Sequence, residues 1–266
     1  MPSMPVKGAR QGESTTMGTL PTLSVQLYSV RRQLAEDLRG TLATLAEIGL
    51  TTVEPYDLLT DPSGLRDALA DNGLTAPSAH TRMASGTNDL DQVFDAAKTV
   101  GVQIVIDPMT DPSRWTTRED ISQVAADLNR AGEKAAGYGL TVGYHNHAFE
   151  WENKIDGTPA LEVFAALLDP TVVLELDTYW AAVGGQDVPA ALRRLGDRVQ
   201  LLHLKDGPIN KTNLDQLPLG DGAMPVAQIV AAAKGLKIPV LEFDDYAGDI
   251  FDGVRRGFEF ARGLGT

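Results

Sequence analysis

The chain has 266 residues, 43% of them hydrophobic and 22% charged, and its 36 acidic residues outnumber 23 basic ones to give a net charge of −13. This negative charge disfavours binding to nucleic acid or to anionic membranes, and makes a neutral or cationic small molecule the easier partner. Because the sequence contains no cysteine, it excludes disulfides, thiolate zinc sites and cysteine nucleophiles.

Residues 1–20 mix Gly, Ser, Thr, Pro and Met without periodicity, which predicts a disordered N-terminal tail. The tail contains Lys7 and Arg10 but no run of 7 to 15 apolar residues, so a secretory signal is not expected. Nowhere does an apolar run approach the roughly 20 residues that span a bilayer. We therefore expect a cytoplasmic protein without a membrane partner.

From Leu23 onward, short apolar runs alternate with amphipathic stretches. In chain order, the strand-like runs cover residues 23–27, 51–54, 76–80, 103–106, 141–144, 172–176, 199–202 and 240–243. Helices are expected between the strands. An apolar face indicates a helix over residues 34–48 and over 90–97, and helices are also expected over 226–234 and 250–264. Elsewhere the signal is a capping residue, a capping box or a proline in the first turn, at Asp61-Pro62, residues 116–119, Thr158-Pro159 and Asp187.

Eight strand–helix units without a break in composition predict one α/β domain over residues 21–266. Eight units favour closure into a (β/α)8 TIM barrel over an open doubly wound sheet. An open sheet would carry a glycine-rich turn after its first strand, whereas here that strand is followed by Tyr28-Ser-Val-Arg-Arg32.

Polar side chains end several of the predicted strands. All four histidines of the chain lie at or just past a strand's C-terminal end, where barrels of this kind place their active sites: His80, His145, His147 and His203. Residues two apart share a face of a strand, so the pattern predicts a cup lined by His145, Asp177, His203 and Glu242.

Two imidazoles and two carboxylates suit one divalent ion: Mn²⁺ first, with Zn²⁺, Co²⁺, Fe²⁺ or Ni²⁺ as alternatives. Mg²⁺ fits less well because it prefers an all-oxygen octahedron.

Other polar residues near the strand ends leave two interpretations open. Glu54 fits either a structural ion pair or a substrate contact, and Lys205 fits either an ion pair or the stabilisation of developing negative charge. Trp180 suits packing or the apolar face of a sugar ring. Glu175 is expected to be a structural charge deeper in the barrel.

From about Leu23 to Leu264 the chain resembles the sugar phosphate isomerases/epimerases of the xylose isomerase-like barrel superfamily. The resemblance is carried by Gln26-Leu-Tyr-Ser-Val30, Val53-Glu-Pro-Tyr56, Gly143-Tyr-His-Asn-His-Ala-Phe-Glu150, Leu176-Asp-Thr-Tyr-Trp180, His203-Leu-Lys-Asp206, Pro218-Leu-Gly-Asp-Gly222 and Leu241-Glu-Phe243. It implies one divalent metal held by Glu, Asp, His and Glu from strands five to eight. The last three positions match Asp177, His203 and Glu242, and His145 stands where the first glutamate is usual.

With histidine in place of glutamate, His145 is either a fourth metal ligand or a base. The change departs from the paired glutamates that serve as acid and base in such enzymes. A second departure is Trp180, where ketose epimerases tend to carry a histidine. The same barrel also runs eliminations in inosose dehydratases. Apurinic-site endonucleases share it too, but they need a histidine-rich zinc cluster that four histidines and a charge of −13 do not favour.

The resemblance and the strand-end pattern together predict a sugar isomerase/epimerase that removes a proton next to the carbonyl of a keto-sugar through a metal-stabilised enediolate. The base would be His145 or Glu150, with Lys205 and His147 steadying the oxyanion or returning the proton. The predicted roles are catalytic for His145, Glu150, Glu242 and Lys205, and substrate-binding for Glu54, His147, Trp180 and His80.

Two alternatives are a lyase or dehydratase that eliminates a β-substituent from a 3-keto-glycoside or inosose, and a metal-free sugar-binding or scaffold barrel. A homo-oligomer and a partner subunit are both compatible with the sequence.

Overall fold

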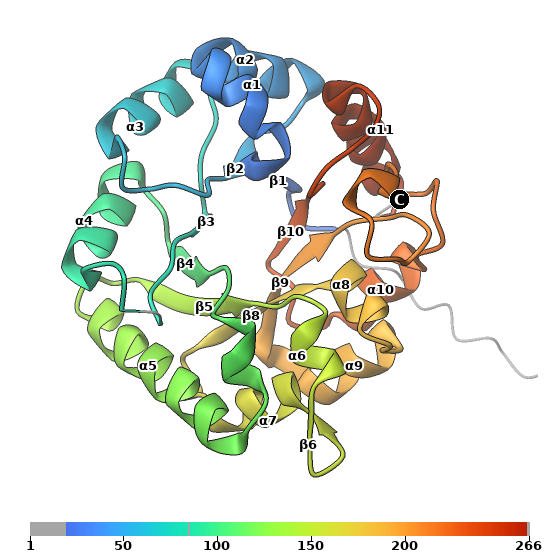
Figure 1. Ribbon diagram of the computed structural model, residues 1–266. Helices are drawn as coiled ribbons and strands as arrows, with labels where there is room; N and C mark the ends of the chain where they lie inside the picture. Colours follow the sequence, from blue (N-terminus) through green and yellow to red (C-terminus); the bar gives the residue numbers. More distant parts are fainter. Residues whose placement is uncertain (1–19, 85, 265–266) are drawn as a thin grey trace, which may run out of the picture.

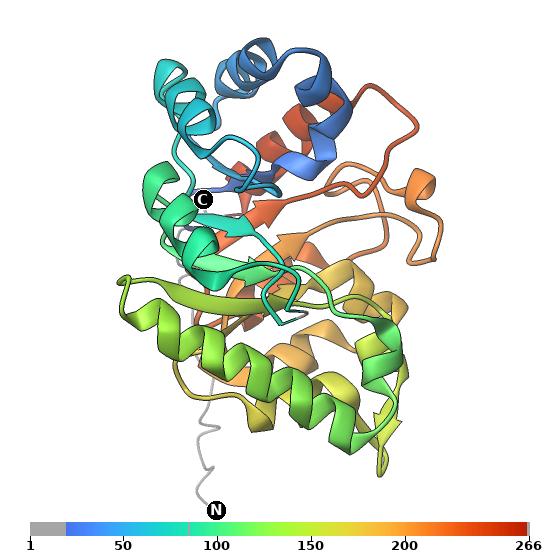
Figure 2. The same ribbon diagram turned by 60° about the vertical axis from the view of Figure 1, so that its left-hand side comes forward.

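A ring of eight parallel strands, surrounded by helices, forms the body of the molecule in the computed structural model (Figures 1 and 2). The structure describes residues 20–84 and 86–264. The eight strands are β1 (Ser24–Gln26), β2 (Thr52–Glu54), β3 (Ser78–His80), β4 (Ile104–Asp107), β5 (Thr141–His145), β8 (Val173–Asp177), β9 (Val199–Leu204) and β10 (Ile238–Leu241). The predicted TIM barrel is confirmed.

The strands pair in the order β2-β1-β10-β9-β8-β5-β4-β3, and every pair is parallel. Backbone hydrogen bonds bring β2 and β3 together at the remaining seam: the amide of Val53 donates to Thr75 O (2.9 Å) and that of His80 to Pro55 O (2.8 Å). In this strand order β5, β8, β9 and β10 are consecutive neighbours around the ring, and the predicted metal ligands lie at their ends.

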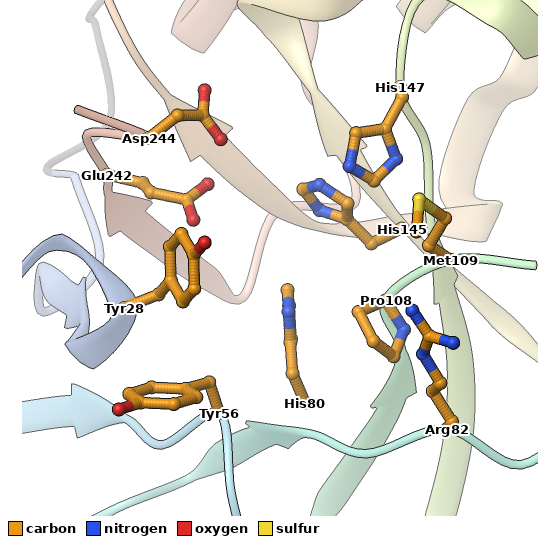
Figure 3. A pocket seen from close by; sticks show the side chains of 10 residues that line it. All are labelled: Tyr28, Tyr56, His80, Arg82, Pro108, Met109, His145, His147, Glu242 and Asp244. Atoms are coloured by element: carbon orange, nitrogen blue, oxygen red, sulfur yellow. The ribbon is translucent and has the colours of Figure 1, made fainter. Parts of the chain in front are cut away.

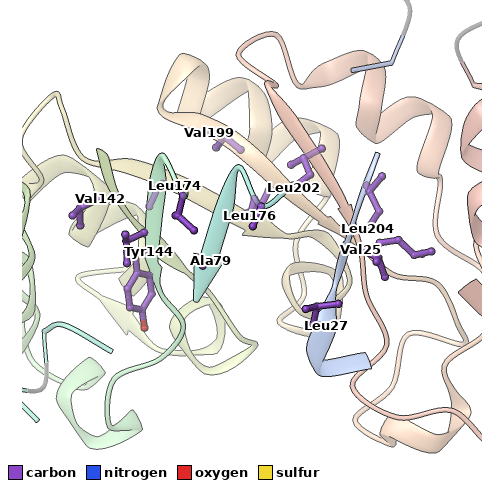
Figure 4. Packing of buried hydrophobic residues seen from close by; sticks show 14 of the residues in the cluster. Val25, Leu27, Ala79, Val142, Tyr144, Leu174, Leu176, Val199, Leu202 and Leu204 are labelled. Atoms are coloured by element: carbon purple, nitrogen blue, oxygen red, sulfur yellow. The ribbon is translucent and has the colours of Figure 1, made fainter. Parts of the chain in front are cut away.

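Helices cover the outside of the ring (Figure 1). They are α1 (Arg31–Glu36), α2 (Leu38–Ile48), α3 (Pro62–Asp71), α4 (Leu90–Val100), α5 (Arg118–Ala136), α6 (Phe149–Glu152), α7 (Ala160–Leu167), α8 (Thr178–Val183), α9 (Val188–Leu195), α10 (Val226–Ala232) and α11 (Ile250–Gly263). The outward side chains of the strands, such as Leu174, Leu176 and Leu202, belong to the large apolar cluster beneath these helices (Figure 4). Burying such a side chain contributes about 1.5–3 kcal/mol, so this cluster stabilises the fold strongly.

The alternate residues of each strand point into the barrel and differ in polarity with depth. Near the strand starts, an apolar group of Ile104, Ile106, Val173 and Leu201 packs with Ile238. Nearer the strand ends lies a set of buried polar residues, here called the polar layer: Gln26, Glu54, Ser78, His80, Glu175 and His203. The polar layer lies between the apolar group and the strand ends, and it includes one predicted metal ligand, His203.

Gly143 on β5 shows how tightly the barrel interior is filled. A Cβ at this position would lie 2.5 Å from Ile106 Cδ1 and 3.1 Å from the carbonyl oxygen of Val173. Only glycine avoids these contacts, and its absence of a side chain lets β4, β5 and β8 approach closely below His145.

The expected elements differ from the observed ones in four places. Asp37 breaks the predicted helix over 34–48 into α1 and α2, because its side chain accepts the amide of Gly40 as a new cap. The cap of α5 is Thr117 rather than Thr116. A hairpin, β6 (Lys154–Ile155) with β7 (Thr158–Pro159), precedes α7, and α8 directly follows β8; neither was predicted.

The expectation of a disordered tail falls almost wholly outside the described residues, since only Leu20 of that segment is among them. Among the described residues, no helix combines the length and apolarity needed to cross a membrane.

Candidate metal centre

The four predicted ligands meet at the C-terminal ends of four adjacent strands. His145 ends β5, Asp177 ends β8, His203 lies in β9 and Glu242 follows β10 directly. All four are buried, and one ligand atom from each lies within 4.8 Å of the others. Bonds from a divalent ion to nitrogen or oxygen are about 2.0–2.2 Å long, so small side-chain adjustments would bring these atoms to one ion. The donor set therefore fits the predicted kind of metal.

Lys205 contributes the positive charge at this point of the structure. Its Nζ lies 2.8 Å from carboxylate oxygens of Asp177, Glu242 and Asp244, and the side chain is buried. Burial lowers the pKa of Lys205, but the three carboxylates outweigh this and hold the pKa well above its ordinary value. Lys205 is therefore charged at neutral pH, and it shares two carboxylates with the predicted ion.

The two carboxylates respond differently to this arrangement. Burial raises the pKa of Asp177 to about 6, against the opposing charge of Lys205. Burial also acts upward on Glu242, but Lys205 and His203 outweigh it and hold the pKa of Glu242 well below its usual value. Both groups are available as anionic ligands at and above neutral pH.

A cavity of about 290 Å³ opens beside these ligands (Figure 3). The cavity is lined by Tyr28, Tyr56, His80, Arg82, Pro108, Met109, His145, His147, Glu242 and Asp244. Tyr28 and Tyr56 form an edge-to-face pair with ring centres 5.4 Å apart, and each is more than a third exposed. Part of the lining is thus aromatic, while other parts carry imidazoles and carboxylates, a combination that suits a small polar ring with apolar faces.

His147 lines the cavity as a neutral imidazole. Burial, followed by the nearby charge of Lys205, lowers the pKa of His147 to about 4. Its Nδ1 is buried and has no hydrogen-bond partner among the described residues. The ring stacks on Phe149 at 5.8 Å, which fixes its plane. The neutral ring of His147 therefore borders the cavity, while its Nδ1 is enclosed by protein.

Glu150, a predicted catalytic residue on the same segment, is not among the residues that line the cavity. Its carboxylate accepts the Tyr144 hydroxyl (2.9 Å) and the His147 amide (2.8 Å), and it is fully buried. Burial raises the pKa of Glu150 to about 8. In this position Glu150 fixes the turn that presents His147.

The predicted substrate-binding residues fall into two groups. His80 and His147 line the cavity, whereas Glu54 and Trp180 do not. Glu54 lies in the polar layer below, and the Trp180 indole donates to Asp244 Oδ2 at 3.1 Å, so it reaches the cavity through that carboxylate.

Several lining residues were missed by the sequence interpretation. Tyr28 and Tyr56 follow the first two strands but are uncharged, so the search for strand-end charges did not select them, while Arg82 and Met109 lie on loops. Asp244 had a usable signal, because it stands two residues after Glu242 on the same face.

Comparison with known proteins agrees with this architecture. Residues 24–260 match the family described as xylose isomerase-like TIM barrel, so the chain belongs to that family. The sugar phosphate isomerase/epimerase of Parabacteroides distasonis superposes with a TM-score of 0.78 at 24% identity, covering 99% of this chain and 100% of that one. A likeness at this identity establishes the fold.

Curated relatives match over shorter spans. An inosose dehydratase of Mesomycoplasma hyopneumoniae is 29% identical over 126 residues, 47% of this chain and 40% of that protein. An inosose dehydratase of Geobacillus kaustophilus is 26% identical over 189 residues, 62% of this chain and 60% of that protein. The match spans less than two thirds of either relative's length. Members of the family thus include enzymes, with more than one reaction among them.

Proposed function

We propose that the chain is a divalent-metal-dependent sugar isomerase or epimerase that removes a proton next to the carbonyl of a keto-sugar. The observation that carries the proposal is the meeting of two imidazoles and two carboxylates from four adjacent strands beside a cavity. At about 290 Å³ the cavity is near the lower end of small-molecule sites, which favours a monosaccharide-sized substrate.

In this proposal, His145, Asp177, His203 and Glu242 would hold one divalent ion. The mixed nitrogen and oxygen donors favour Mn²⁺, with Zn²⁺, Co²⁺, Fe²⁺ and Ni²⁺ as competitors. When bound, the ion supplies a Lewis acid that polarises a carbonyl and so acidifies the neighbouring C–H.

Proton transfer is assigned to His147. Its ring lines the cavity and is neutral at pH 7, whereas Glu150 does not line the cavity and accepts hydrogen bonds through both oxygens. Lys205 does not line the cavity, but its Nζ lies 2.8 Å from Glu242 and Asp244, which do, so its charge would stabilise a substrate oxygen on which negative charge develops. The aromatic pair of Tyr28 and Tyr56 would contact the C–H face of the sugar, with His80 on the polar side.

A second candidate is a dehydratase or lyase, and the similarity to two inosose dehydratases favours it. Both reactions begin with removal of the same kind of proton. They differ in whether the proton returns to the substrate or a β-substituent leaves.

Solvent exchange distinguishes these outcomes. The protein is dialysed against chelator, reloaded with Mn²⁺ and incubated in D₂O with 3-keto-sugars and with inososes. Deuterium incorporation with an epimeric or isomeric product supports the main proposal, and release of water or of an aglycone supports the lyase.

Two further results limit the proposal. His147→Gln is expected to lower the exchange rate at least 100-fold while substrate binding stays within a few-fold, since a base contributes typically 10²–10⁴. Failure of the wild-type protein to bind stoichiometric metal would instead support a metal-free sugar-binding or scaffold barrel.

A further inference from the structure

Two carboxylates of the polar layer, Glu54 and Glu175, contact the histidine ligands from below. Glu175 Oε2 lies 2.6 Å from His80 Nε2 and 3.1 Å from His145 Nδ1. His203 Nε2 lies 2.8 Å from Glu54 Oε1 and 3.1 Å from Glu175 Oε2. Each imidazole therefore directs one ring nitrogen into the polar layer.

The second nitrogen of each predicted ligand faces the other way. His145 Nε2 lies 3.7 Å from Asp177 Oδ2, and His203 Nδ1 lies 2.5 Å from Glu242 Oε2. The same two rings thus present opposite nitrogens to the candidate centre, Nε2 from His145 and Nδ1 from His203. A histidine binds a metal through the nitrogen that carries no proton, so the proton has to stay on the nitrogen that faces the polar layer.

We infer that Glu54 and Glu175 are positioning residues that orient His145 and His203 and fix which ring nitrogen of each is free to bind the metal. The inference rests on the proposed function, since it concerns the same metal centre. Carboxylates that accept a hydrogen bond from a metal-binding histidine commonly orient its ring, and their loss typically weakens metal binding 10- to 100-fold.

The surroundings of the two carboxylates support this role. Glu54 is anchored by Gln26 Nε2 at 2.9 Å and by the Ser78 hydroxyl, so its Oε1 is held toward His203. Glu175 has no hydrogen-bond partner for Oε1 among the described residues, and its contacts run through Oε2 to imidazoles. Neither carboxylate makes an ion pair with Lys or Arg in the described part of the chain. A buried carboxylate whose only charged partners are histidines is suited to orienting them.

A second ion inside the polar layer is the competing interpretation. Ligand atoms of His80, His145, Glu175 and His203 also lie within 4.8 Å of one another. However, the nitrogens there are at hydrogen-bonding distance from a carboxylate oxygen, 2.6–3.1 Å. Occupation of both places would require His145 and His203 to bind metal through both nitrogens. In the upper place His203 Nδ1 is also close to a carboxylate, 2.5 Å from Glu242 Oε2, but His145 Nε2 lies 3.7 Å from Asp177 Oδ2, beyond hydrogen-bonding distance. The open nitrogen of His145 therefore favours one ion above and hydrogen bonds below.

The wild-type protein provides the first test. Histidine ¹⁵N spectra of the Zn²⁺-loaded protein are expected to show a proton on Nδ1 of His145 and on Nε2 of His203, with metal-shifted signals from the opposite nitrogens. The reverse assignment at either ring would overturn the inference, as would two Zn²⁺ ions per chain. This measurement needs no substitution and so does not depend on how a variant folds.

The second test measures Mn²⁺ affinity in Glu175→Gln. The amide keeps the shape but offers a weaker acceptor, and the dissociation constant is expected to rise 10- to 100-fold. Asp107→Asn is the matched control: it is an equally buried carboxylate at the end of β4, but it accepts the backbone amides of Met83, Ala84 and Met109 and no imidazole.

The control is expected to bind Mn²⁺ within threefold of wild type. A folded Glu175→Gln protein with wild-type affinity would overturn the positioning role alone. A wild-type protein that binds neither Mn²⁺ nor Zn²⁺ would overturn the proposed function together with it, so the two failures are distinguishable.

Discussion

At the scale of single residues, Lys205 decides the charge of the candidate site. It contacts three buried or half-buried carboxylates within 2.8 Å, two of which are predicted metal ligands. A divalent ion and this ammonium would both attract Asp177 and Glu242, whereas Asp244 is the one of the three carboxylates that is not a predicted ligand; it also accepts hydrogen bonds from Trp180 and Gln216. The ammonium therefore neutralises part of the charge that would otherwise destabilise the metal-free protein.

Replacing Lys205 by Met tests this balance. We expect the metal-free protein to lose about 3–5 kcal/mol in its free energy of unfolding, because buried carboxylates are left without their partner. Mn²⁺ should restore part of the loss, so its stabilising effect in urea unfolding should exceed that in the wild type. Lys211→Met is the control: its ion pair with Glu152 is exposed, and its loss should cost less than about 1 kcal/mol. Equal stability of both variants would contradict the argument.

Glu150 gives a pH dependence that can be predicted with its sign. Burial raises its pKa in the folded protein to about 8, from 4.5. The folded state therefore holds a proton that the unfolded state releases, and the stability from this group is complete below pH 4.5 and is lost as the pH rises through about 8. The effect is about 3–5 kcal/mol across that window.

Glu150→Gln should remove this part of the pH dependence. The amide can donate to the Tyr144 hydroxyl and accept from the His147 amide, as the neutral acid does, so the variant should equal the wild type at pH 5 and exceed it at pH 9. Unfolding curves at both pH values measure this. Glu152→Gln, on the same short helix but exposed at its surface, should keep the wild-type profile. A parallel profile for Glu150→Gln would show that this carboxyl does not titrate there.

The sequence predicted that the four candidate ligands would converge, because period-two alternation and strand ends are local properties. His145, Asp177, His203 and Glu242 each lie at or near the end of a strand, and the barrel brings them together. It did not predict the contacts of Glu54 and Glu175 with the histidines, because these depend on the depth of each side chain inside the ring. Strand register and the close approach at Gly143 set that depth, and neither can be read from one strand.

At the scale of elements, the sequence located helices better than their first residues. Two successive threonines precede α5, and the pattern from Thr116 to Glu119 resembles a capping box. In the structure a 3-10 turn covers residues 112–115 and Thr116 ends it. Thr117 is therefore the cap of α5, and its hydroxyl accepts the Asp120 amide at 3.1 Å. Asp37 is likewise a residue type that caps helices, but the leucine repeat on both sides of it favoured one continuous helix.

The two threonines allow a direct comparison. Thr117→Ala should lower the free energy of unfolding by about 1 kcal/mol, the usual cost of losing a cap. Thr116→Ala removes only a hydrogen bond from its hydroxyl to Ser113 O on the exposed surface and should cost less than half as much. Urea unfolding of the two variants measures both values. A larger loss of stability in Thr116→Ala than in Thr117→Ala would instead indicate that Thr116 caps the helix.

At the scale of the whole molecule, the barrel was predictable because eight regular strand–helix units leave few ways to bury both faces of a parallel sheet. Closure has a consequence for stability. The four predicted ligands come from β5, β8, β9 and β10, a continuous arc of the ring, and an ion joining them would hold that arc together. The unfolded chain offers no such arrangement, so binding energy should appear as folding energy.

Mn²⁺ at 100 times its dissociation constant should therefore raise the free energy of unfolding by about 2.7 kcal/mol. Asp177→Asn should abolish this gain, because the amide can still cap α8 through the Trp180 amide but is a poor ligand. Asp187→Asn makes the same change at the cap of α9, away from the site, and should keep the full gain. Urea unfolding of the three proteins with and without Mn²⁺ measures these gains. An equal gain in Asp177→Asn and the wild type would place the ion elsewhere on this acidic chain, because nonspecific binding to surface carboxylates does not depend on Asp177.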